Sequence, residues 1–90
     1  MTKPQLDRAR VLLASAAEDA SDTEARETLS NLSDQLDRLA DSDHGPDHGR
    51  LAHIKAKLED IQARESDAVA VTIEDALDEI HAFRETIEGV

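Results

Sequence analysis

Residues 41–50, Asp-Ser-Asp-His-Gly-Pro-Asp-His-Gly-Arg, divide the chain into two halves with strongly helical patterns. The stretch holds two of the three glycines, one of the two prolines and two of the four histidines. Gly45 suits the end of a helix and Pro46 suits the first position of the next one. We therefore expect this segment to be the main hinge, at which the second half folds back on the first.

The segments before the hinge predict two helices, over about residues 4–19 and 22–41. Pro4 sits at a plausible first helical position, and apolar residues, mostly alanine, recur at helical spacing after it. Ser21 with Glu24 has the pattern of a capping box and marks the start of the second helix. That helix carries apolar residues at alternating spacings of four and three, as in a coiled-coil seam or a bundle.

The segments after the hinge predict helices over about residues 46–64 and 67–88. We expect a break near residues 65–71, where Ser66 or Asp67 could cap a new helix and Thr72 with Asp75 offers a later start. One unbroken helix is also geometrically allowed because the two apolar stripes are nearly in phase. His81 is expected to pack at the boundary of the last stripe.

The predicted fold class is all-α, an antiparallel bundle of three to four helices in a single domain. Large apolar side chains are few in 90 residues, and the fourteen alanines bury little area each. Homodimerisation would bury more surface, so we expect a dimer to complete the bundle. The sequence pattern does not separate core from interface among the residues of the apolar stripes, which are Leu29, Leu32, Leu36, Leu39, Leu51, Ile54, Leu58, Ile61, Ile73, Leu77, Ile80, Phe83 and Ile87.

The composition is strongly acidic, with 21 Asp and Glu against 10 Lys and Arg and a net charge of −11. The acids are spread along every segment, which favours adaptation to concentrated salt over an acidic tail that binds a basic partner. The acidic binder of a basic partner stays as an alternative. A basic stripe for nucleic acid is not visible, and Phe83 is the only aromatic residue for base stacking. With no apolar run long enough for a signal peptide or a membrane span, we expect a cytoplasmic protein.

The sharpest candidate for chemistry is the His/Asp cluster within residues 41–53. Its members are Asp41, Asp43, His44, Asp47, His48 and His53. His and Asp are metal ligands, so a metal-responsive protein is an alternative. His44 and His48 straddle Gly45 and Pro46, however, so they do not share a helix face. We expect turn residues rather than a metal site, no cofactor and no catalytic residues. The favoured function is a non-enzymatic structural or protein-interaction module, with a helical partner.

Two stretches resemble a family of small acidic proteins from haloarchaea. They are residues 45–52, Gly-Pro-Asp-His-Gly-Arg-Leu-Ala, and residues 83–90, Phe-Arg-Glu-Thr-Ile-Glu-Gly-Val. The similarity covers most of the chain, and to our knowledge that family has no assigned function. The resemblance implies a salt-adapted cytoplasmic protein and carries over no functional residue.

Overall fold

A computed structural model describes residues 4–41 and 48–88, and of Asp41, His48, Ile87 and Glu88 it describes the backbone alone. Four helices make up this part of the chain. They are α1 (Pro4–Asp19), α2 (Thr23–Asp41), α3 (His48–Arg64) and α4 (Asp67–Glu88). The described residues contain no strand, so the predicted all-α class is confirmed. No described residue has a positive φ, and neither short turn, residues 20–22 or 65–66, contains a glycine.

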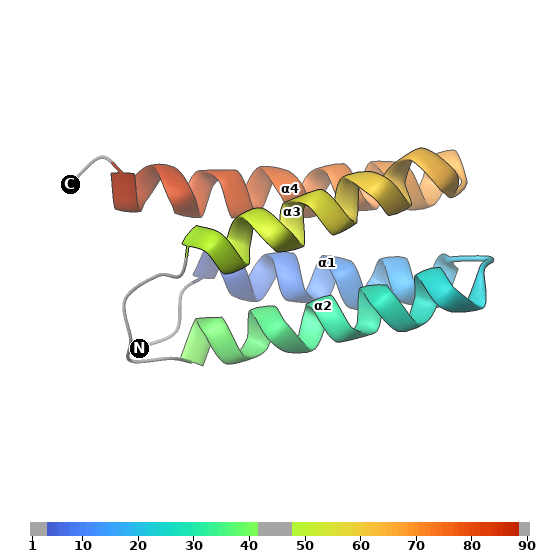
Figure 1. Cartoon of the computed structure of the whole chain (residues 1–90), viewed down its shortest axis with the longest axis horizontal. Coiled ribbons are helices and arrows are strands. Elements are labelled where there is room, and N and C mark those ends of the chain that lie inside the picture. The colour runs from blue at the N-terminus through green and yellow to red at the C-terminus, as the bar shows by residue number, and fades with distance from the viewer. Residues whose placement is uncertain (1–3, 42–47, 89–90) are drawn as a thin grey trace.

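The helices lie side by side, and successive helices run in opposite directions (Figure 1). α1 has the most extensive packing, against both α2 and α4, and α3 packs mainly on α4. α2 and α3 touch each other least among these neighbouring pairs. The α2–α3 seam is therefore the most loosely packed side of the molecule.

Small residues explain the central place of α1. Its buried face alternates leucine and alanine, with Leu6, Ala9, Leu13 and Ala16 each 0–1% exposed. Alanine leaves the helix axis close to its neighbours, so α1 can pack on two helices at once. The leucines fill the space that remains between the four helices.

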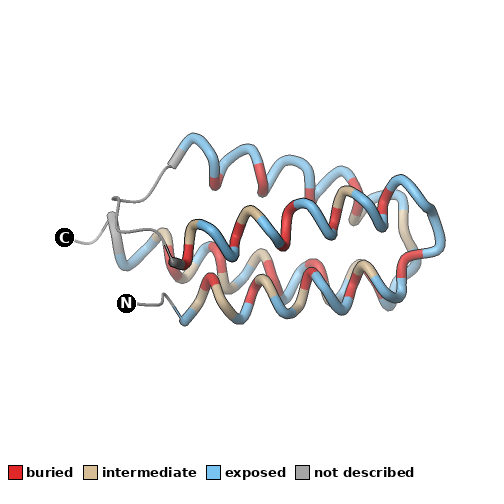
Figure 2. The backbone as a smooth tube through the Cα atoms, turned by 90° about the horizontal axis from the view of Figure 1, so that it is seen from below, coloured by how far each residue is buried: buried red, intermediate tan, exposed pale blue. Residues whose placement is uncertain are grey.

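The core runs along the inner faces of all four helices, and the outer faces are exposed (Figure 2). Ten of the thirteen residues of the predicted apolar stripes are buried, whereas Leu39 and Leu77 are partly buried against that core. The Ile87 side chain lies outside the described residues. Among the described side chains Ser33 is the one buried polar residue, and its Oγ donates to the carbonyl oxygen of Arg10 at 2.9 Å.

The start of α2 differs from the predicted capping box. Asp22 is the capping residue, because its Oδ2 accepts the backbone N–H of Ala25 at 3.0 Å, in the first turn of the helix. Ser21 instead directs its N–H and its hydroxyl to the Glu65 carboxylate on the other half of the chain. The local pattern could not show this, since a contact over 44 residues has no local signature.

The second half of the chain forms two helices, with the break at Glu65 and Ser66. Ser66 caps α4 by accepting the Val69 N–H on its hydroxyl at 3.4 Å. The alternative start at Thr72 is wrong, because Thr72 lies inside α4 and its hydroxyl donates to the Ala68 carbonyl. Gln62 ties the two helices together by donating to the Ala70 carbonyl and to Glu74.

Candidate functional site

The His/Asp cluster of the hinge lies almost wholly outside the described residues. This holds for Asp43, His44 and Asp47, and for the side chains of Asp41 and His48. His53 is exposed on α3. Within residues 4–41 and 48–88, no three His, Asp or Glu side chains gather closely enough to hold a metal ion. The metal hypothesis therefore stays a prediction for the hinge.

His81 does not pack at the boundary of the core, so that expectation is wrong. Its side chain is 74% exposed on α4, and Nε2 lies 2.8 Å from Oε1 of Glu85, one turn further on. Ile80 and Phe83 on either side of it take the buried positions. His81 is next to the buried Ile80 in sequence, but its own position lies on the outer face of α4, so its side chain points away from the core.

A bridge between the two turns at one end of the molecule is the feature that sequence reasoning missed. Glu65 accepts the N–H of Ser21 at 3.1 Å and its hydroxyl at 3.3 Å on Oε1, and the N–H of Asp22 at 3.3 Å on Oε2. One carboxylate thus satisfies two backbone donors near the start of α2 and joins the α1–α2 turn to the α3–α4 turn.

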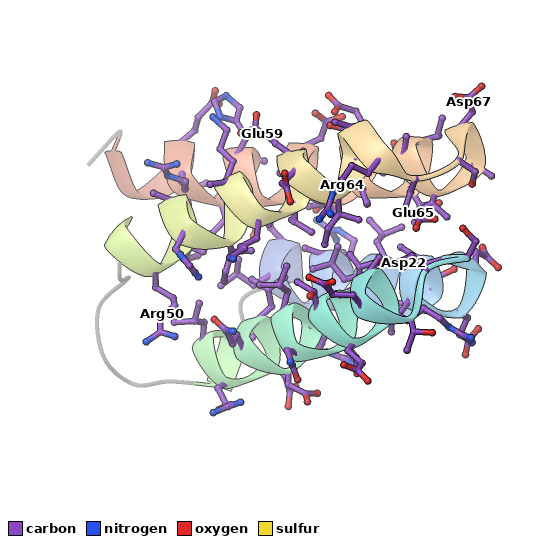
Figure 3. The ribbon with its side chains drawn as sticks, turned by 45° about the vertical axis from the view of Figure 1, so that its right-hand side comes forward. Asp22, Arg50, Glu59, Arg64, Glu65 and Asp67 are labelled. Carbon is purple, nitrogen blue, oxygen red and sulfur yellow. The ribbon has the colours of Figure 1, made fainter. Side chains whose placement is uncertain are left out.

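A depression beside this bridge is lined by residues of the α1–α2 turn, α2, α3 and the α3–α4 turn. They are Ser21, Asp22, Ala25, Ile61, Arg64 and Glu65. Figure 3 shows Arg64 and Glu65 on the side of α3 that faces α2, with Asp22 opposite and Arg50 near the other end of the helix. Arg50 Nη1 donates to Oε1 of Gln35 on α2 at 3.3 Å. The α2–α3 seam is thus crossed at both ends by polar contacts.

We expect the Glu65 bridge to stabilise the fold measurably. Replacing Glu65 by Ala removes three hydrogen bonds to a charged acceptor and should lower the free energy of unfolding by about 1 kcal/mol, a value reduced for partial exposure. Urea denaturation followed by circular dichroism measures the change. Glu59→Ala is the matched control, since Glu59 is an exposed glutamate on α3, six residues before Glu65. Equal stability of the two variants would contradict the bridge.

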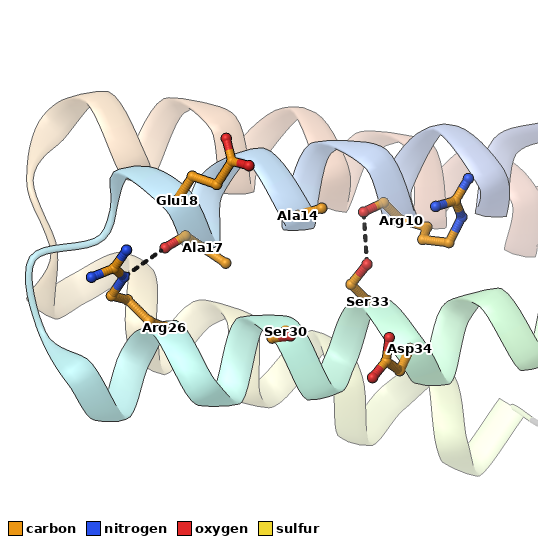
Figure 4. A pocket seen from close by; sticks show the side chains of 8 residues that line it. All are labelled: Arg10, Ala14, Ala17, Glu18, Arg26, Ser30, Ser33 and Asp34. Atoms are coloured by element: carbon orange, nitrogen blue, oxygen red, sulfur yellow. Dashed lines mark hydrogen bonds between the residues drawn. The ribbon is translucent and has the colours of Figure 1, made fainter.

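A second groove, between α1 and α2, has polar groups that hold the two helices together (Figure 4). Its walls are small residues and charged residues of both signs: Arg10, Ala14, Ala17, Glu18, Arg26, Ser30, Ser33 and Asp34. Ser33 bonds to the Arg10 carbonyl, and Arg26 Nε donates to the Ala17 carbonyl at 3.2 Å. Because these donors serve the α1–α2 contact, the groove is explained as part of the fold.

Comparison with known proteins places the chain in a family without assigning a role. Residues 1–86 match the family described as "Family of unknown function (DUF7553)". The chain belongs to this family. No curated protein and no solved structure matches the chain. The family of unknown function agrees with the expectation of an uncharacterised family, and no relative's name supplies a specific function.

None of the helices in the described part of the chain is long and apolar enough to cross a membrane. Each helix alternates buried aliphatic positions with charged, exposed ones. Among the described residues, the charged and polar groups therefore lie on the exposed faces of the helices and in the seams between them.

Proposed function

We propose that this chain is a non-enzymatic structural or protein-interaction module of a salt-adapted cytoplasm, working as an antiparallel four-helix bundle that associates as a homodimer. The observation that carries the proposal is the separation of aliphatic interior from charged exterior. Every described Asp, Glu, Lys and Arg side chain is exposed or partly exposed, and the one buried polar side chain is used in α1–α2 packing. Such a surface supplies contacts to other helices rather than a desolvated reaction centre.

The small core supports association with a second chain. The buried set contains one aromatic residue, Phe83, and four alanines on α1 and α2 that contribute little area each. A domain of this length is marginally stable by its own burial, and a second copy would remove further surface from water. A helical partner protein could use the same exposed faces.

Sedimentation equilibrium in molar KCl tests this proposal. We expect a species of twice the 9.8 kDa chain mass, dissociating on dilution. A monomer mass at every concentration up to the millimolar range would refute the homodimer. Affinity capture with the tagged chain in molar KCl, followed by identification of helical partners, then tests the interaction role. Turnover of a substrate by the purified chain would contradict the non-enzymatic part.

A further inference from the structure

α3 differs from the other helices in how little of it is covered. Of its sixteen residues from 49 to 64, eleven are exposed, whereas seven of the sixteen residues of α1 are exposed. Gln62 is half-buried beside α4. The buried side chains form one narrow stripe and are each 0–2% exposed: Leu51, Ile54, Leu58 and Ile61. α3 is therefore held to the bundle mainly by a single row of aliphatic side chains.

The other three helices form a layer with α1 in the middle. Within the described residues, α1 has close backbone contacts with α2 and α4, whereas α2 and α4 have none with each other. Polar contacts also join this layer, from Ser33 to the Arg10 carbonyl oxygen and from Arg8 to Glu79. α3 lies between α2 and α4 (Figure 3) and makes no close backbone contact with α1 in the part of the chain that the structure describes.

Without α3, the apolar faces of α2 and α4 would flank an open groove with α1 as its floor. These faces belong to the same core cluster as the buried stripe of α3. They carry buried aliphatic residues, which include Leu29, Leu32, Leu36, Ile73 and Ile80. The four buried residues of α3 recur at i, i+3, i+7 and i+10, the spacing with which an amphipathic helix binds in an apolar groove. α3 thus occupies the α2–α4 groove in the manner of a helical ligand.

The charges of α3 suit this position between two acidic helices. α3 has four basic residues against two acids, a net charge of +2, and the pairing of Arg64 with Asp60 lies within the helix and leaves this sum unchanged. α2 has five acids against two arginines, a net charge of −3, and α4 has seven against one, a net charge of −6. Oppositely charged surfaces attract, so the two sides of the groove favour an occupant of net positive charge.

We propose that the groove between α2 and α4 binds a basic amphipathic helix of a partner protein, and that α3 is the tethered occupant which this partner displaces. The partner helix carries aliphatic residues at i, i+3, i+7 and i+10, with Lys or Arg beside them. A tethered helix competes at a high effective concentration, so the groove accepts a partner only in the fraction of molecules in which α3 has left. The inference rests on the proposed interaction module and names its site and its class of partner.

A partner protein suits the groove better than a second copy of this chain. α1, α2 and α4 of a second copy are all net negative and would be repelled by the acidic helices beside the groove. The α3 of a second copy has the right charge, but it would have to leave its own groove first. A basic helix from another protein meets neither obstacle.

A fluorescent peptide of residues 48–64 tests the groove in trans, with the full chain in molar KCl and binding measured by fluorescence anisotropy. The wild-type chain should bind it weakly, because its own α3 occupies the groove. Leu58→Ala in the chain removes one buried side chain from the tethered helix and should raise the affinity for the peptide about ten-fold or more. Glu65→Ala, which releases the end of α3 and leaves its buried stripe intact, should act in the same direction and replaces Leu58→Ala if that variant does not fold. Absence of peptide binding to a folded variant would overturn the proposal.

Ile73→Ala is the matched control, since it also truncates a buried aliphatic side chain but does so in the α4 side of the groove. It should not raise the affinity for the peptide. An equal rise with Leu58→Ala and Ile73→Ala would mean that the peptide binds any destabilised chain, which would overturn the site. A peptide carrying Leu58→Asp should not bind, whereas unchanged binding would show that the aliphatic stripe is not what the groove recognises.

The charge of the partner is tested with a peptide carrying Lys55→Glu and Lys57→Glu. The titration uses the lowest KCl concentration at which circular dichroism shows the chain to be folded, because salt screens the attraction. The reversed peptide should bind about ten-fold more weakly than the natural one. Equal affinity of the two peptides would overturn the basic class of partner.

Native-state hydrogen exchange of the wild-type chain tests the release of α3 without any variant. After correction for intrinsic rates, the α3 amides should exchange about ten-fold or more faster than those around Leu13 of α1, because α3 can open while the other three helices stay together. Equal protection of α3 and α1 would overturn the displacement. If the peptide binds none of the folded chains while affinity capture still returns helical partners, the groove is wrong and the interaction module stands. Capture of no helical partner would contradict the proposed function itself.

Discussion

Replacing Ile73 by Ala is expected to lower the free energy of unfolding by about 2–5 kcal/mol. Ile73 is fully buried on α4, where its side chain reaches the core between the helices. The substitution removes three methyl or methylene groups from packed surroundings and leaves a cavity that the helices fill incompletely. Small domains are stable by only about 5–15 kcal/mol, so a change of this size should be plain in urea denaturation.

Two valines on the same helix provide the matched comparison. Val69 is 0% exposed and Val71 is 62% exposed, and the two positions are separated by one residue. Val69→Ala should lower the free energy of unfolding by about 2 kcal/mol, and Val71→Ala by well under 0.5 kcal/mol. Because both substitutions remove the same atoms, the difference measures the burial of the two side chains. Equal losses at the two positions would show that the assigned inner face of α4 is wrong.

The stripe of α4 shows how far periodicity predicts this fold. Ile73, Ile80 and Phe83 recur at helical spacing, and a helix of that pattern can bury one face alone, so their place in the structure follows from the sequence. Leu39 and Leu77 obey the same spacing but are partly buried, because each lies at the edge of its stripe. Periodicity predicts which face of a helix is buried. How deeply each residue on that face is buried depends on the neighbouring helices.

Contacts between the turns could not be predicted from local patterns. Ser21 with Glu24 fits a capping box, yet Ser21 bonds to Glu65, which is distant in sequence and close in the fold. The Arg50–Gln35 bond shows the same limit, because it depends on α3 lying beside α2 in the fold.

The second large effect concerns salt. Raising KCl from about 0.1 M to about 1 M should increase the free energy of unfolding by about 2 kcal/mol or more, which corresponds to a rise of about 8–16 °C in Tm. The cause is repulsion among exposed carboxylates in a chain of net charge −11. The screening length falls from about 10 Å to about 3 Å over this range, so repulsion beyond nearest neighbours largely disappears. Thermal denaturation by circular dichroism at fixed protein concentration measures the shift.

Carboxylate variants on α4 separate screening from a general effect of salt on hydrophobic burial. Asp75 and Asp78 are exposed on the helix with the most acidic charge. Changing both to Asn removes two negative charges from that face, so the chain should be more stable in dilute buffer and depend less steeply on KCl. If salt acts by strengthening apolar burial, the variant keeps the wild-type slope, because no buried surface has changed. A wild-type Tm that is the same in dilute buffer and in molar KCl would contradict salt adaptation. It would show that repulsion among the carboxylates, which outnumber the basic residues by 21 to 10, does not measurably destabilise the folded state.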